Sequence, residues 1–166
     1  MVTRAMPDLP GKPVRDSAIN DQAAIVFPTD LNALGTLFGG RVMEQADILC
    51  AIVARRHAGR YCVTLGIDTV RFLSPARHGD ILAFKSAVNR VWRTSMEIGV
   101  KVYADDAQTL ARKHIVSAYF TFVAVDEHMN KVEIAPVIPE TDDEKRRYAQ
   151  AEQRRQVRMG TMKGGA

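Results

Sequence analysis

The chain has 166 residues, of which 46% are hydrophobic and 25% are charged, a composition typical of one globular domain rather than a disordered or fibrous protein. No run approaches the ~20 apolar residues of a transmembrane helix, and the N-terminal region has no apolar stretch of the kind found in secretory signals. The formal net charge of +4 favours an anionic partner, and nucleic acid, a membrane surface or a phosphorylated cofactor would each fit.

The first part of the chain predicts a tail, a strand and a loop. Residues 1–20 are polar and contain three prolines, so we expect a flexible N-terminal tail. The short apolar segment Ala23–Pro28 predicts a first strand. Residues 29–36 are polar and rich in turn-forming residues, which predicts a loop.

A helix is predicted from Gly39 to about His57, with Gly59 as its stop signal. Between Ala46 and Ala54 its residues are apolar on nearly every side, which is typical of a helix buried within its own protein. Such a helix needs other elements to cover it, and the chain that follows supplies mainly strands.

Four long strands are predicted next, with boundaries at Tyr61–Leu73, Ile81–Trp92, Ser95–Tyr103 and Leu110–Val125. Apolar residues alternate with other residues in the third of them, which is typical of a strand with one buried face. Short turns join the strands, so we expect an antiparallel meander. Long antiparallel strands wrapped around one buried helix form an α+β hotdog fold, and this is the fold class that we predict.

A basic C-terminal helix is predicted from Glu140 to Arg158, and Thr141 and Glu144 have the spacing of a capping box. Acidic residues are interspersed with its Lys and Arg residues, and no aromatic stacking motif accompanies them. These features favour a solvated helix, and we expect no nucleic-acid partner. The chain therefore divides into the tail, a hotdog domain at residues 21–139, and a basic helix and tail at residues 140–166.

The two cysteines, Cys50 and Cys62, both lie in apolar stretches. This placement favours free buried thiols over a disulfide, because free Cys is among the most buried residue types. Free thiols are typical of a reducing compartment, so we expect a cytoplasmic protein.

Asp47 is the leading candidate for chemistry. On a helix its neighbours at three and four residues are mostly small or apolar, and they include Met43, Cys50 and Ala51. A carboxylate in this setting is partly desolvated, which makes it a stronger base near neutral pH. Because burying a charge is costly, a functional role is favoured over a structural Asp bonded to backbone or to a neighbouring strand.

Three weaker candidates accompany Asp47. Asn32 lies in the loop before the helix, where a structural turn residue is the commoner explanation. Gly39 and Gly40 leave the helix-start amides open to polarise a carbonyl, although glycines there also permit tight packing on a strand. Thr64 offers a strand hydroxyl, and such hydroxyls are mostly structural.

Other kinds of site are not indicated. The four histidines are scattered without metal-ligand spacing. Neither a Gly-x-Ser-x-Gly elbow nor a phosphate-binding Gly-Lys-Ser/Thr loop occurs. We therefore expect no metal and no serine nucleophile.

At this point the pattern resembles the acyl-CoA thioesterase family of hotdog hydrolases, and most of all its single-domain bacterial members. The segments that carry the resemblance are Pro28–Gly40, Met43, Asp47, Val70–Pro75, Gly79-Asp80 and Arg93–Met96. The spaced pattern of Asn, Gly, Phe-Gly-Gly and Asp is fairly specific. The resemblance covers roughly Ala23 to Val125 and leaves out both tails.

The resemblance implies hydrolysis of an acyl-CoA to a free carboxylic acid and CoA. It implies no stored cofactor, because CoA is part of the substrate. It implies that Asp47 is the general base or the nucleophile, and that Asn32 positions the water or the thioester. The Gly40 amide would polarise the thioester carbonyl, and Thr64 would hold the attacking water. It also implies a homodimer with active sites at the interface, in which Asn32 and Asp47 come from different subunits, and the assembly of dimers into hexamers.

The CoA phosphates require basic groups near that interface. The residues that we assign to CoA binding are Gly39, Arg71, Arg90, Arg93, Thr94, Ser95 and Lys113. The alternative is that the strand arginines are simply solvated. Arg41 departs from the family pattern, in which a bulky apolar residue is frequent, and it either reaches a CoA phosphate or lies exposed.

Three other functions stay open. A hotdog hydratase usually pairs the Asp with a His, and no His lies near Asp47 on its helix. A non-catalytic acyl-CoA binding or sensing module would keep the fold and the basic groups but would not need a buried carboxylate. Nucleic-acid binding through the C-terminal helix is compatible with catalysis elsewhere.

Overall fold

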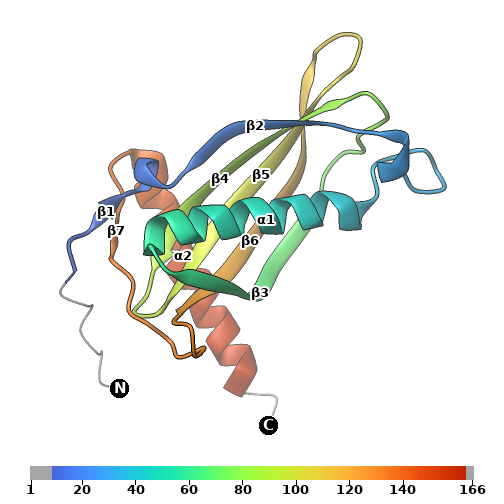
Figure 1. Cartoon of the computed structure of the whole chain (residues 1–166). Helices are drawn as coiled ribbons and strands as arrows, with labels where there is room; N and C mark the ends of the chain where they lie inside the picture. The colour runs from blue at the N-terminus through green and yellow to red at the C-terminus, as the bar shows by residue number, and fades with distance from the viewer. Residues whose placement is uncertain (1–8, 164–166) are drawn as a thin grey trace.

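The computed structural model of the protein describes residues 9–163, and the side chains of residues 9–160. One five-stranded antiparallel sheet forms the centre of the molecule, with strand order β2-β4-β5-β6-β3. Its strands are β2 (Ile19–Ile25), β3 (Tyr61–Phe72), β4 (Ile81–Val91), β5 (Ser95–Asp105) and β6 (Arg112–Val125). Helix α1 (Gly39–Ala58) crosses one face of this sheet, and helix α2 (Asp142–Lys163) lies behind the other (Figure 1).

This arrangement confirms the predicted α+β hotdog fold, with one correction to its topology. β4, β5 and β6 form the expected meander, but β3 pairs with β6 and not with β4. β2 pairs with β4 and so forms the opposite edge. The link between β3 and β4 therefore runs from the edge strand β3, past β6 and β5, to β4 on the far side of the meander.

α1 packs one apolar face on the sheet. Val42, Ala46, Cys50 and Val53 are buried, at the helical spacing of one face, and they belong to the same core as side chains from β4, β5 and β6. Gly59 ends the helix with a φ of 64°. The opposite face differs from the prediction of all-round burial, because Ile48 is 54% exposed in the single chain.

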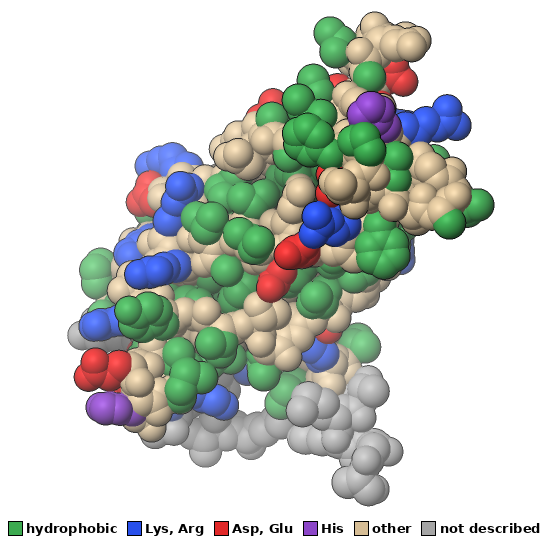
Figure 2. Space-filling model, turned by 45° about the vertical axis from the view of Figure 1, so that its right-hand side comes forward, with side chains coloured by type: hydrophobic (Ala, Val, Ile, Leu, Met, Phe, Trp, Pro, Cys, Tyr) green, Lys and Arg blue, Asp and Glu red, His purple; other side chains and the backbone are tan. Residues whose placement is uncertain are grey.

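β3 is an edge strand whose outer edge has no partner among the described residues. Both of its faces are largely exposed, and its apolar side chains include Leu65, which is 69% exposed. Figure 2 shows hydrophobic side chains spread over the face of the molecule on which α1 lies. A long unpaired apolar strand next to an open helix face is typical of a surface that another chain covers.

The N-terminal region differs from the predicted tail. β1 (Lys12–Pro13) pairs in parallel with β7 (Val137–Ile138), and Val14, in the short helix η1 (Val14–Asp16), belongs to the core. Residues 1–8 lie outside the described part of the chain. No helix in residues 9–163 is both long and apolar enough to cross a membrane.

α2 packs on the sheet through charged and aromatic side chains. Arg154 donates two hydrogen bonds to Glu97 of β5, at 3.0 and 2.7 Å, and Glu97 is completely buried. The Arg154 guanidinium also lies 3.7 Å from the centre of the Tyr119 ring. Thr141 and Glu144 make the predicted capping box at the helix start. α2 is therefore not the freely solvated helix that its sequence predicts.

His57 is buried in the last turn of α1, where its Nε2 lies 3.0 Å from the carbonyl oxygen of Ala135. Burial lowers the pKa of this imidazole below its usual value. The ring therefore stays neutral in the folded protein under conditions in which an unfolded His takes up a proton.

The first prediction concerns the attachment of α2. Replacing Arg154 with Met should lower the free energy of unfolding by about 3 kcal/mol, because the buried Glu97 carboxylate loses its cationic partner. Arg146→Met on the same helix is the matched control, since Arg146 pairs with Asp143 at the exposed surface. Urea denaturation checks both variants. Equal midpoints for Arg154→Met and the wild type would contradict the assigned role.

The second prediction concerns His57. Because the unfolded chain binds a proton that the folded chain does not, the free energy of unfolding should fall as the pH drops below about 6.5. His57→Gln should show a smaller loss between pH 7.5 and pH 5.5 in urea denaturation. The exposed control His128→Gln should keep the wild-type dependence, and a pH dependence unchanged by His57→Gln would exclude His57 as the titrating group.

Candidate functional site

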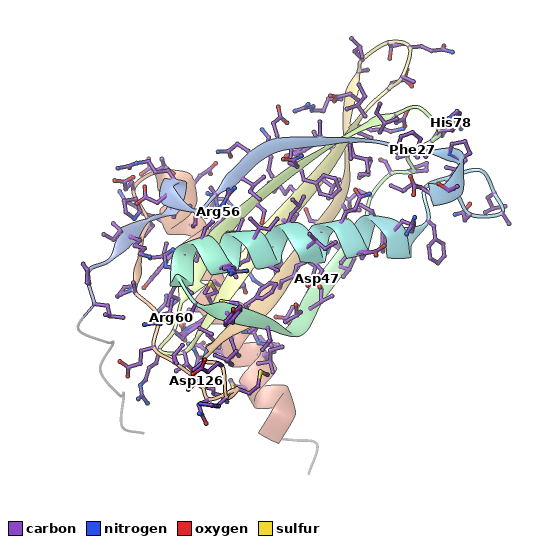
Figure 3. All side chains as sticks on the ribbon, viewed as in Figure 1. Phe27, Asp47, Arg56, Arg60, His78 and Asp126 are labelled. Atoms are coloured by element: carbon purple, nitrogen blue, oxygen red, sulfur yellow. The ribbon has the colours of Figure 1, made fainter. Side chains whose placement is uncertain are left out.

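Asp47 and Thr64 meet between α1 and β3. The Thr64 hydroxyl donates a hydrogen bond to Oδ1 of Asp47 at 2.8 Å. β3 pairs with β6 so that Thr64 lies opposite Phe122, a core residue, and its side chain consequently points to α1. Figure 3 shows Asp47 on the side of α1 that is nearest β3. The strand hydroxyl and the helix carboxylate of the sequence prediction therefore form one pair.

The surroundings of this pair are apolar but open. Asp47 is half-buried, and Ile48 and Ile52 beside it on α1 are exposed. The Asp47 carboxylate keeps one oxygen that no described side chain bonds. A small molecule, or a second chain, can therefore approach the carboxylate from the exposed face of α1.

Asn32 lies in the loop between the short helix η2 (Pro28–Asp30) and α1. Its Oδ1 accepts hydrogen bonds from the backbone N–H groups of Leu34 and Thr36, at 2.9 and 3.2 Å. Its Nδ2 donates to the Thr36 hydroxyl at 2.9 Å. Within one protomer this side chain therefore holds its own loop, as the structural alternative predicts.

The helix start combines open amides with tight packing. The N–H groups of Gly39 and Gly40 stand in the first turn of α1, where a helix has no internal acceptor for them. A Cβ on Gly40 would come within 2.7 Å of the Phe38 ring, and a Cβ on Gly39 within 3.1 Å of the Phe72 ring. Glycine lets the two rings pack closely on the helix start, and the same absence of side chains leaves the amides accessible.

Asp30 supports this region, and the sequence analysis does not predict its role. Its carboxylate accepts hydrogen bonds from the Phe27 N–H at 2.9 Å and from Nε of Arg41 at 3.3 Å. Its carbonyl oxygen accepts from the N–H of Phe38 at 2.8 Å. Asp30 is the last residue of η2, and its bond to the N–H of Phe27 is one half of a capping box, the other half being absent because Phe27 has no side-chain acceptor. Arg41 also pairs with Glu44 at 3.1 Å, so two carboxylates hold this cation.

The residues assigned to CoA phosphates are dispersed over the sheet. Three of them pair with carboxylates: Arg90 with Glu152 at 3.1 Å, Arg93 with Glu133 at 2.6 Å, and Lys113 with Asp80 at 3.9 Å. Arg71 has no ion pair within residues 9–160, and it lines a groove with residues of α2. Thr94 and Ser95 lie in and after the turn between β4 and β5. None of these side chains contacts Asp47 in the described protomer.

Both cysteines have free thiols. Burial raises the pKa of Cys50 to about 12 and that of Cys62 to about 11. Neither thiol is therefore a thiolate at neutral pH, and neither is suited to nucleophilic attack. Residues 9–160 contain no group of three or more His, Cys, Asp and Glu side chains arranged to hold a metal ion.

Comparisons with known proteins agree with this geometry. Residues 34–111 match the family described as the thioesterase superfamily. The chain is 40% identical over 119 residues to the uncharacterized acyl-CoA thioester hydrolase YkhA of Bacillus subtilis, covering 72% of this chain and 69% of YkhA. A hexameric acyl-CoA thioesterase superposes with a TM-score of 0.89 at 37% identity, covering 93% of this chain and 98% of that chain.

The acyl-CoA hydrolase of Staphylococcus aureus, solved with butyryl-CoA, CoA and CoA disulfide, gives a TM-score of 0.85 at 36% identity, covering 93% of this chain and 96% of that chain. Other structures of that hydrolase carry single replacements of an Asp, an Asn and a Thr by Ala. Those three positions are separated by the same numbers of residues as Asp47, Asn32 and Thr64 here. By its identity and coverage, the chain belongs to the thioesterase superfamily.

Proposed function

We propose that the protein hydrolyses acyl-CoA thioesters to a free carboxylic acid and CoA, with Asp47 as the reactive group. The observation that carries this proposal is the Asp47 carboxylate, held at 2.8 Å by the Thr64 hydroxyl on an open apolar face. The acyl-CoA hydrolases with similar sequences and structures support the substrate class. The free thiols agree with a cytoplasmic enzyme.

In the proposed reaction, Asp47 takes a proton from a water molecule whose oxygen attacks the thioester carbonyl carbon. Helix-start amides donate hydrogen bonds to the carbonyl oxygen and so stabilise the negative charge that develops on it. The carbon–sulfur bond then breaks, and the departing CoA thiolate recovers the proton from Asp47. Thr64 orients the carboxylate by donating to one of its oxygens, which leaves the other oxygen for the water. Direct attack by the carboxylate on the carbonyl is the alternative first step.

A site shared between two protomers fits these distances better than a site within one. Gly40 and Asp47 are seven residues apart on the same helix, which corresponds to about 10 Å along its axis. One thioester carbonyl cannot contact both at once. We infer that Asp47 and Thr64 of one protomer work with Asn32 and the amides of Gly39 and Gly40 from another.

β3 supplies the surface for such a pairing. Its unpaired outer edge can add the β3 strand of a second copy in antiparallel orientation, which extends the sheet and buries side chains such as Leu65 and Ile67. The two α1 helices would then run antiparallel beside each other, and the start of one would approach Asp47 of the other. The structural relative described as hexameric supports further assembly of such dimers into a hexamer.

Only some of the side chains assigned to CoA are free of other polar partners within residues 9–160. Arg71, Thr94 and Ser95 keep polar groups available for the nucleotide end of CoA. Arg90, Arg93 and Lys113 would have to exchange their carboxylate partners for phosphates. Arg71 lies on the α2 side of the sheet, so it would contact CoA that a neighbouring dimer binds.

The third prediction tests Asp47. Asp47→Asn should lower kcat by about 100-fold or more, because the amide keeps the shape of the side chain but cannot take a proton from water. The measurement is thiol release from a panel of acyl-CoAs of increasing chain length. Asp106→Asn, at an exposed turn, is the control and should keep wild-type turnover.

Near-normal turnover by Asp47→Asn would remove Asp47 from the mechanism. Tight CoA binding by the wild type without thiol release from any substrate would favour a binding or sensing module. Calorimetric titration with CoA separates that result from a failure to bind.

The fourth prediction tests the shared site. Asn32→Ala and Asp47→Asn should each be strongly impaired, yet mixing and re-assembling them should restore about a quarter of wild-type activity. Half of the re-formed dimers would be mixed, and each mixed dimer would contain one intact site out of two. If both residues act within one chain, mixing restores nothing, and that result would exclude the shared site.

A further inference from the structure

We propose that the apolar cavity beside the start of α1 receives the acyl group of the substrate, and that Phe72 sets the length of chain that the enzyme prefers. This inference rests on the proposed hydrolysis and deepens it by naming the residue that selects among acyl chains. The cavity has a volume of about 380 Å³, and its apolar lining includes Leu37, Val42, Phe72, Ala76, Ile115 and Val116. We call it the acyl cavity.

The floor of the acyl cavity belongs to the protein core. Val42, Ala76, Ile115 and Val116 are all buried, and they come from α1, from the link between β3 and β4, and from β6. Side chains packed in this way cannot collapse into the space at low cost. The cavity is therefore preformed, as small-molecule sites usually are, and it does not depend on rearrangement of the core.

The position of the acyl cavity suits a thioester held at the helix start. Gly39 lines the cavity, and its amide is one of the two that have no acceptor within α1. A carbonyl oxygen that accepts from this amide places its carbon at the cavity mouth. The acyl chain then enters the apolar space, while the CoA part remains outside, where the partner's site would meet it.

Among the lining residues of the acyl cavity, Phe72 is best placed to select among acyl groups. It is the last residue of β3, it is 58% exposed in the single chain, and it packs so closely on Gly39 that a Cβ there would lie 3.1 Å from the ring. The ring therefore separates the cavity from solvent at the helix start. The volume of about 380 Å³ has room for roughly a dozen groups of about 30 Å³ each, so the position of the Phe72 ring, and not the total volume, decides how far an acyl chain extends.

The fifth prediction compares a variant that fills the acyl cavity with one that opens it. Ala76→Leu should lower kcat/KM for hexanoyl-CoA about 10-fold more than for acetyl-CoA, since the added side chain competes with the outer methylene groups. Phe72→Ala should shift the preference toward longer chains, with a relative gain of about 10-fold for dodecanoyl-CoA over butyryl-CoA. Acetyl-, butyryl-, hexanoyl-, octanoyl- and dodecanoyl-CoA are the probes.

Leu110→Ala is the matched control, because Leu110 is an exposed apolar residue in the connection between β5 and β6, outside the cavity lining. It should keep the wild-type chain-length profile. Melting curves establish that each variant is folded, and if Ala76→Leu is not, Phe72→Ala alone decides. An unchanged profile in a folded, active Phe72→Ala would overturn the assignment of the cavity while leaving the proposed hydrolysis intact. Absence of hydrolysis by the wild type with every probe would overturn both.

Discussion

The pairing of β3 with β6 is the interaction on which the candidate site depends. In this register Thr64 lies opposite Phe122 and faces α1, where it meets Asp47. Each of two irregularities in β3, one after Thr64 and one after Asp68, inserts one extra residue, so the second restores the alternation that the first reverses. Phe72, opposite Val116, therefore faces the helix as Thr64 does. A slip of one residue would turn Thr64 to the other side of the sheet and leave the carboxylate without its hydroxyl. The edge strand β3 therefore positions both the hydroxyl that bonds Asp47 and the Phe72 ring that lines the neighbouring cavity.

The two faces of the sheet are covered by different physical means. α1 is held by the volume and shape of apolar side chains, whereas α2 is held by directed bonds to a buried carboxylate. Asn89 and Arg154 both bond Glu97, and Gly99 is needed beside them because a Cβ there would lie 2.8 Å from the Asn89 amide. A buried ion pair of this kind adds little net stability against an apolar substitute, but it admits few orientations of the helix. The face of the sheet that α2 covers thereby sets the position of that helix, while the face that α1 covers provides most of the core.

Local patterns predict the elements well and the long-range pairings poorly. α1 and the long strands begin and end within about two residues of prediction, because alternation, helical spacing and Gly59 are local signals. The choice of β6 over β4 as the partner of β3 has no local signal. At the site, the apolar neighbours of Asp47 are visible in the sequence. The carboxylates that hold Arg90, Arg93 and Lys113 lie far along the chain, so these cations seem available until the fold brings their partners together.

The free edge of β3 also matters before the protein assembles. The strand is twelve residues long, has neither proline nor lysine, and exposes Leu65 and Ile67. Two irregularities in its register and the charges of Asp68 and Arg71 protect part of this edge from indiscriminate pairing, but residues 61–67 carry no charged side chain. In a newly made chain the uncharged part of this edge stays open to pairing with other strands until a partner covers it. The speed with which copies find one another after synthesis, and not the stability of the fold alone, then determines how much protein escapes aggregation in the cell.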